Sequence, residues 1–187
     1  MRKNEGLTLI ELMVVLVVVA ILIGLAAPGL RSLLVRWAAD TAAASLADDF
    51  RYARSEAIKR NDFVTICRSA DGNSCIGQAG SWHTGWLVFV DHDSDAVVDA
   101  ASTTSAPPTP ADVILRVQPA LSWVESVQPL TGNGRDAYKF RPTGLAPGNQ
   151  GNLVVTASAS VPGGSVLLCI SSTGRIQARP GQVACSS

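Results

Sequence analysis

The chain opens an apolar run with Leu7-Thr8-Leu9-Ile10-Glu11-Leu12-Met13, and this run reaches Ala27 with Glu11 as its only charged residue. As a helix rising about 1.5 Å per residue, residues 7–27 would span roughly the 30 Å hydrocarbon core of a bilayer. A carboxylate inside such a segment costs about 2.5 to 3.5 kcal/mol on insertion scales, so it is usually there for a partner. The sequence therefore predicts a membrane-length helix in which Glu11 meets a positive group.

An ordinary secretory signal is the alternative interpretation of this start. Arg2 and Lys3 supply the positive leader, and small residues precede Pro28. However, the apolar run is longer than the usual signal core, Glu11 interrupts it, and Pro28 directly follows the only small-residue cleavage site. These three features favour an anchor that is retained.

The helical pattern continues beyond the apolar run. Apolar residues recur at helical spacing from Arg31 to Arg60, and Pro28-Gly29 is expected to bend or loosen the helix between the two parts. We expect the charged residues of this stretch to mark its solvated or subunit-facing side; they include Asp40, Asp48, Arg51 and Glu56.

After Asn61 the apolar period changes to two, which predicts short strands separated by Gly, Pro, Asn and Ser clusters. The proline-rich segment 100–110 is expected to be a connection rather than a central strand. The fold class is therefore α+β, a long N-terminal helix followed by a C-terminal antiparallel β-sandwich. The expected strands cover 63–68, 86–91, 113–118, 121–127, 138–141, 153–157, 166–171 and 175–179.

Charge and cysteine usage fit an anchored domain outside the cytoplasm. The 15 basic and 15 acidic residues give a formal net charge of zero, but basic residues outnumber acidic ones from Ala101 onward. The four cysteines indicate an oxidising compartment. Their spacing favours the pairs Cys67 to Cys75 and Cys169 to Cys185, although three connectivities are open to a set of four.

Two clusters are candidates for a catalytic or metal site. The acidic motif from Asp91 to Asp99 begins like a calcium loop, but Ala96 and Ser102 stand where the turn glycine and the bidentate glutamate belong. The sequence favours a solvated acidic turn. His83 lies among tryptophans without a paired acid or a nucleophile, which favours aromatic packing. We therefore predict no catalytic residue, no metal site and no cofactor.

The C-terminal segment Gly174 to Gly181 carries the remaining candidate site. Strand alternation would place Arg175, Gln177 and Arg179 on one face, and no acidic residue follows Val166. Such a face could hold phosphates by charge without reading base identity. A solvated edge strand with guarding charges is the alternative interpretation.

The segment Gly6-Leu7-Thr8-Leu9-Ile10-Glu11-Leu12-Met13-Val14 resembles the prepilin signature of type IV pilins and pseudopilins. The resemblance implies that prepilin peptidase cleaves after Gly6 and methylates the new N-terminus at Leu7. It also implies that Glu11 neutralises the N-terminal amine of a neighbouring subunit during assembly. We therefore expect a leader at 1–6, a transmembrane assembly helix at 7–28, its amphipathic continuation at 29–60 and a β-rich domain at 61–187.

Further pieces of the chain resemble the GspH/FimT branch of this family. They are the helical segment from Phe50 to Ala57, the strand Gly85 to Asp91, the segment Phe140-Arg141-Pro142-Thr143-Gly144 and the terminal Gly174-Arg175. The branch contains minor pilins and minor pseudopilins of type II secretion. Some of its pilins bind DNA through a glycine-arginine motif with a second arginine two places on, where this chain has Gln177.

The resemblance implies a non-enzymatic minor pilin that primes or enters a type IV pilus and contributes to DNA uptake. A minor pseudopilin of type II secretion and a DNA-binding receptor pilin are the alternatives. The expected partners are prepilin peptidase, other pilins or pseudopilins and double-stranded DNA. The expected location is the bacterial inner membrane, with one membrane pass and a periplasmic domain, and then the extracellular pilus after assembly.

Overall fold

The computed structural model describes residues 8–77, 80–101, 108–130, 135–148, 150–181 and 184–185, without the side chains of residues 25–28. Its one α-helix in these ranges, α1 (Leu9–Arg60), is 52 residues long. The chain divides into two compact units, Met1–Leu34 and Val35–Ser187, so that α1 contributes to both. We describe each unit by itself.

In the first unit, α1 exposes apolar side chains around its whole circumference. The large apolar residues described between Leu9 and Ile23 are all between 43% and 77% exposed. Within the described residues, no single helix meets the length and apolarity needed to cross a membrane, whereas the bent pair Leu9–Gly24 and Gly29–Arg60 meets them together. The bend falls beside Pro28-Gly29, where the sequence predicts it.

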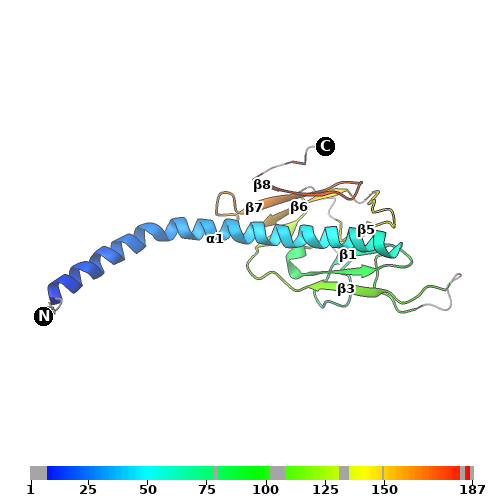
Figure 1. Cartoon of the computed structure of the whole chain (residues 1–187), viewed down its shortest axis with the longest axis horizontal. Coiled ribbons are helices and arrows are strands. Elements are labelled where there is room, and N and C mark those ends of the chain that lie inside the picture. The colour runs from blue at the N-terminus through cyan, green and yellow to red at the C-terminus, as the bar shows by residue number, and fades with distance from the viewer. Residues whose placement is uncertain are drawn as a thin grey trace, which may run out of the picture. The chain divides into compact units, whose positions relative to one another are not determined.

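The second unit contains two antiparallel sheets of four strands each (Figure 1). The first sheet has the order β3-β2-β1-β5 and the second has the order β4-β6-β7-β8. A short 3-10 helix, η1 (Trp82–Thr84), precedes β2. The strands are β1 (Val64–Arg68), β2 (Trp86–Val90), β3 (Val113–Gln118), β4 (Ser126–Gln128), β5 (Ala137–Phe140), β6 (Gly151–Thr156), β7 (Ser165–Ile170) and β8 (Ile176–Pro180).

The C-terminal part of α1 forms one hydrophobic core with both sheets. Figure 1 shows it running along the strands, with β6, β7 and β8 on one side and β1 and β3 on the other. Small side chains such as Ala43 and Ala53 are fully buried on this helix face, which lets the strands approach closely. Phe50 packs edge-on against Tyr138 of β5, with ring centroids 5.1 Å apart. These contacts hold α1 as the central element of the unit.

This architecture confirms the predicted fold class, with two local corrections. The predicted strand over 121–127 is wrong, because Leu121 and Val124 both turn into the core through a tight turn and only β4 pairs with β6. Glu56 is not solvated: it is 6% exposed, and its carboxylate accepts from Arg60 Nε at 2.6 Å. This hydrogen bond lowers the pKa of Glu56 despite burial.

Candidate assembly and ligand-binding sites

The helix carrying Glu11 begins with a side-chain cap. The Glu11 backbone N–H donates to Thr8 Oγ1 at 3.3 Å, as at the start of a capping box. An acidic residue in the first turn also interacts favourably with the helix dipole. The Glu11 carboxylate makes no ion pair within the described part of the chain. Gly6 and Leu7, the predicted cleavage and methylation residues, lie outside the described residues.

Both disulfides form in the pairing that the sequence favours. Cys67 is bonded to Cys75 with Cα atoms 5.6 Å apart, and Cys169 to Cys185 with Cα atoms 5.7 Å apart. The first bond ties the end of β1 to the loop that follows it. The second ties β7 to the residues beyond β8, so it fastens the C-terminal segment to the sheet that carries the candidate DNA-binding residues.

The structure brings the C-terminal candidates together on and beside the edge strand β8. The strand begins at Ile176, which is buried, whereas Gln177 and Arg179 lie on the other face. Arg179 Nη2 donates to Gln177 Oε1 at 2.9 Å. Arg175 precedes the strand, and with Gln177 it lines a hollow of about 390 Å³ beside the Cys169–Cys185 bond. The predicted strand start at Arg175 is therefore one residue early, but the three side chains remain neighbours.

Gly174 lies where the turn before β8 closely approaches the turn ending at Gly144, and this contact positions the adjacent Arg175. Gly174 has a φ of +73°, and a Cβ at this position would overlap the Gly144 carbonyl oxygen. Arg54 of α1 donates from Nη1 to the Gly174 carbonyl at 3.3 Å. Three segments that are far apart in the sequence therefore meet at one place: the helix around Arg54, the turn ending at Gly144 and the turn before β8.

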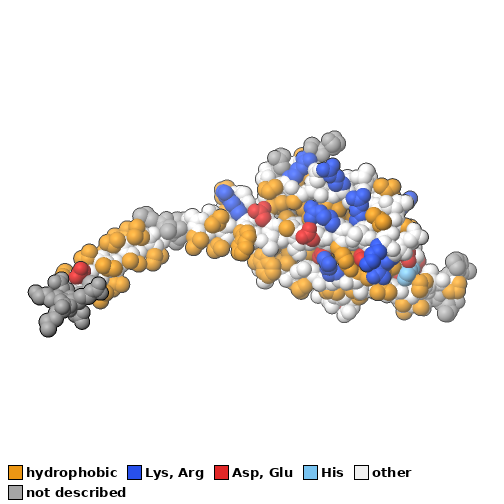
Figure 2. Space-filling view, in the orientation of Figure 1, with side chains coloured by type: hydrophobic (Ala, Val, Ile, Leu, Met, Phe, Trp, Pro, Cys, Tyr) orange, Lys and Arg blue, Asp and Glu red, His pale blue; other side chains and the backbone are white. Residues whose placement is uncertain are grey.

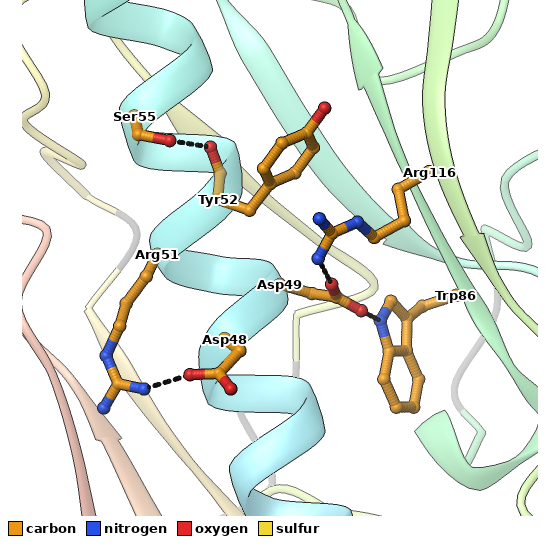
Figure 3. A network of polar contacts seen from close by, with 7 residues as sticks. All are labelled: Asp48, Asp49, Arg51, Tyr52, Ser55, Trp86 and Arg116. Atoms are coloured by element: carbon orange, nitrogen blue, oxygen red, sulfur yellow. Dashed lines mark hydrogen bonds and ion pairs between the residues drawn. The ribbon is translucent and has the colours of Figure 1, made fainter.

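A buried carboxylate joins α1 to the first sheet (Figure 3). Asp49 is 3% exposed and accepts two hydrogen bonds, from Trp86 Nε1 at 2.7 Å and from Arg116 Nη1 at 2.6 Å. The Arg116 guanidinium also lies 3.9 Å from the ring centroid of Tyr52, a cation-π contact. The hydrogen bond that Arg116 donates to Asp49 raises the pKa of Arg116. The network fixes how α1 docks on β2 and β3, which is a structural role.

Asp49 is not among the predicted site residues, although the sequence contains a signal for it. Leu46 precedes it by three residues and Ala53 follows it by four, so Asp49 lies on the apolar face of the helix. A carboxylate on such a face needs buried donors. The donors could not be identified in advance, because Trp86 and Arg116 are 37 and 67 residues away.

The acidic loop after β2 stabilises itself through its own hydrogen bonds. Asp91, Asp93 and Asp95 each place a carboxylate oxygen within 4.8 Å of the others. Asp91 is fully buried and accepts from the Thr65 hydroxyl at 2.6 Å, and Lys139 Nζ donates to the Ser94 carbonyl. Burial raises the pKa of Asp91 above its usual range. The loop is thus held by contacts of Asp91 with β1 and of the Ser94 carbonyl with Lys139 of β5, as a structural turn is.

His83 belongs to the packing around η1. Its Nδ1 lies 2.5 Å from Ser81 Oγ, and its neighbours Trp82 and Trp86 are buried in the core. Ser81 Oγ also accepts from the Val127 backbone N–H at 2.8 Å, which ties η1 to β4. In this arrangement the imidazole and the Ser81 hydroxyl hold a turn in place.

Comparison with known proteins connects this geometry to a family. Residues 42–174 match the family described as type II transport protein GspH, and residues 1–27 match the prokaryotic N-terminal methylation motif. Over 96 residues the chain is 43% identical to the pilin-like protein PilA1 of Thermus thermophilus, covering 51% of this chain and 54% of that protein. The chain thus spans about half the length of this relative.

Two crystal structures of the type IV minor pilin FimU from Pseudomonas aeruginosa share the fold. Their TM-scores are 0.54 and 0.53, at 19% and 20% sequence identity. The matches cover 76% and 75% of this chain, and 88% and 92% of the FimU chains. Because the GspH match covers well over half of the chain and follows an N-terminal methylation motif, the chain belongs to the GspH family of type IV pilin-like proteins.

Proposed function

We propose that this protein is a minor pilin that prepilin peptidase cleaves after Gly6, methylates at Leu7, and delivers to a type IV pilus, which it enters or primes. One observation carries the proposal: from Leu9 to Ile23, α1 exposes large apolar side chains on all faces, with Glu11 as the only charged residue in that stretch. The match to an N-terminal methylation motif and the FimU fold support it. The protein is then a structural subunit rather than an enzyme.

A helix with apolar side chains on every face needs surroundings other than water. Apolar side chains exposed on every face are stable in lipid or within a bundle of similar helices. We infer that the inner membrane holds the helix before assembly, with the second unit in the periplasm. In the filament, the Glu11 carboxylate would neutralise the N-terminal amine of a neighbouring subunit, because opposite charges removed from water are tolerable when they meet.

The test is the variant Glu11→Ala, assayed for incorporation into sheared pili. We expect normal folding and leader cleavage but lower incorporation, because the neighbouring amine would lose its partner. Asp40→Ala is the matched control, since Asp40 is an exposed carboxylate on the same helix outside the apolar run. Normal incorporation of Glu11→Ala, or an equal loss in both variants, would exclude charge neutralisation by Glu11.

A minor pseudopilin of type II secretion is the second candidate, favoured by the description of the matching family. The same anchor would then serve a short periplasmic filament that moves folded proteins outward. Deletion of the gene separates the two functions. Loss of pili with intact exoprotein secretion supports the pilin, and the opposite result supports the pseudopilin.

A DNA-binding role is the third candidate, favoured by Arg175, Gln177 and Arg179 lying next to one another. We expect the full chain in nonionic detergent to bind labelled duplex DNA with an affinity that falls as salt rises. The double variant Arg175→Ala, Arg179→Ala should weaken this binding. Absence of binding by the wild type at low salt would exclude DNA as a ligand.

A further inference from the structure

A second hollow lies next to the C-terminal arginines, between α1 and the turn before β8. Its volume is about 320 Å³, and its lining comes from two segments. Four helix residues at helical spacing form one wall, and the turn forms the other. The lining residues are Arg51, Arg54, Ser55 and Ile58 from α1, and Gly174, Arg175 and Ile176 from the turn.

The lining of this hollow is positively charged and contains no acidic residue. Arg54 makes one long hydrogen bond, to the Gly174 carbonyl, and its Nε is buried without a hydrogen-bond partner. Neither Arg54 nor Arg175 makes an ion pair within the described ranges. A partly buried guanidinium without a counter-charge is poorly compensated for its lost hydration, and an anion beside it would supply that compensation.

Arg51 is the one arginine of the hollow that has an acidic partner. Its Nη1 lies 2.6 Å from Asp48 Oδ1, and both side chains are more than half exposed (Figure 3). An exposed ion pair of this kind contributes little to stability, so Arg51 can exchange Asp48 for another anion at small cost. Asp48 is therefore a weak competitor at the rim of the hollow.

We propose that this hollow binds a phosphate group, held by Arg51, Arg54 and Arg175. Guanidinium groups match phosphate oxygens in charge and in hydrogen-bond geometry, and a phosphate offers several acceptors to more than one arginine. The guanidinium groups of Arg54 and Arg175, which have no acidic partner among the described residues, supply donors from the two walls of the hollow. The site is thus built from both α1 and the β7–β8 turn.

The favoured source of this phosphate is the backbone of duplex DNA, and this step rests on the DNA-binding role proposed above. Arg175 lines both hollows, and Gln177 lines the hollow beside the Cys169–Cys185 bond and accepts a hydrogen bond from Arg179. Figure 2 shows basic side chains gathered over this part of the second unit with fewer acidic ones between them. A polyanion can therefore follow one basic surface from α1 to β8, contacting successive phosphates.

The experiment titrates labelled duplex DNA with the full chain in nonionic detergent at several salt concentrations, comparing four single variants. Arg51→Gln and Arg54→Gln should each weaken binding about fivefold and reduce the salt slope by about 1, as expected for one lost phosphate contact. Asp48→Asn should tighten binding, because it removes the competing charge. A gain of affinity cannot result from misfolding.

Arg36→Gln is the matched control. Arg36 lies on α1, and its Nε donates to the Pro162 carbonyl at 3.1 Å, so the change removes the same charge and a similar hydrogen bond. It lies about 27 Å along the helix from Arg54, given a rise of 1.5 Å per residue. We expect wild-type DNA affinity for Arg36→Gln.

The outcomes separate this proposal from the DNA-binding role itself. If Arg51→Gln and Asp48→Asn leave the affinity unchanged while the Arg175, Arg179 double variant lowers it, the hollow is not a phosphate site and DNA binding stands. If the wild type binds no DNA, the DNA-binding role fails, and binding of inorganic phosphate then tests whether the hollow is a phosphate site. If phosphate raises the unfolding temperature of the wild type and Arg36→Gln more than chloride does, and this difference is lost in Arg51→Gln, the phosphate site in the hollow is supported. If phosphate raises it no more than chloride, or raises it equally in all three proteins, the site is excluded.

Discussion

The tightest constraint on a single residue falls on Gly174, where the turn before β8 meets the turn ending at Gly144. Its positive φ is a conformation that other residues reach at a cost of roughly 1 to 2 kcal/mol. In addition, its position leaves no room for a Cβ against the Gly144 carbonyl. The glycine next to Arg175 is therefore required by packing, whatever Arg175 binds.

Gly174→Ala should lower the free energy of unfolding by about 2 to 4 kcal/mol, because backbone strain and steric overlap add. Gly181→Ala is the control: Gly181 has a φ of +65°, but beyond its chain neighbours no heavy atom of the described residues lies within 4 Å of its Cβ position. It should cost only about 1 kcal/mol, from strain alone. Urea unfolding followed by tryptophan fluorescence measures both, and equal losses would exclude the overlap.

At the scale of elements, α1 and the strands are largely predictable from local pattern. The apolar period of 3.6 extends to Arg60 and the period of two begins directly afterwards, so the helix end and most strands fall within two residues of expectation. The failures have a common cause. Glu56 and the stretch from Leu121 to Val124 are set by tertiary contacts, which a local period does not contain.

The same limit applies to the candidate sites. The residues of the prepilin signature lie close together in the sequence, and so do the C-terminal arginines, so each could be identified as a motif. The hollow formed by Arg54 and Arg175 could not, because 120 residues separate Arg54 from its hydrogen-bond partner Gly174. Such pairs depend on how α1 docks on the sheets.

Asp49 is the residue on which this docking depends most. Asp49→Ala should lower the free energy of unfolding by about 3 to 5 kcal/mol, because it leaves Arg116 and the Trp86 N–H without their buried acceptor. Asp48→Ala, at the adjacent exposed position, should cost no more than about 0.5 kcal/mol. Urea denaturation of both variants checks this contrast, and similar losses would argue against the buried network.

For the whole molecule, two buried carboxylates give stability a predictable dependence on pH. Burial raises the pKa of Asp91, so the folded protein binds this proton more tightly than the unfolded chain does. The resulting stabilisation is complete below the ordinary carboxyl pKa of about 4 and is lost as pH rises through the raised value. The free energy of unfolding of the wild type should therefore decrease as pH rises above about 4, and Asp91→Asn should abolish this decrease.

Glu56→Gln provides the opposite test. The hydrogen bond from Arg60 lowers the pKa of Glu56, so its stabilisation is present above the ordinary pKa of about 4 and is lost as pH falls through the lowered value. Unfolding midpoints of the wild type and both variants, measured from pH 3 to pH 7, should show slope changes of opposite sign. Parallel curves for all three proteins would contradict both assignments.

The two disulfides also determine how the molecule responds to mechanical load. They close loops with sequence separations of eight and 16 residues. An unfolded chain spans at most about 3.3 to 3.6 Å per residue, whereas each intact bond holds its two Cα atoms 5.6 or 5.7 Å apart, so a chain pulled from its two ends would extend roughly 70 Å less with both bonds intact. Stretching the oxidised protein therefore lengthens it less than stretching the reduced protein, which gives the molecule a redox-dependent limit on extension.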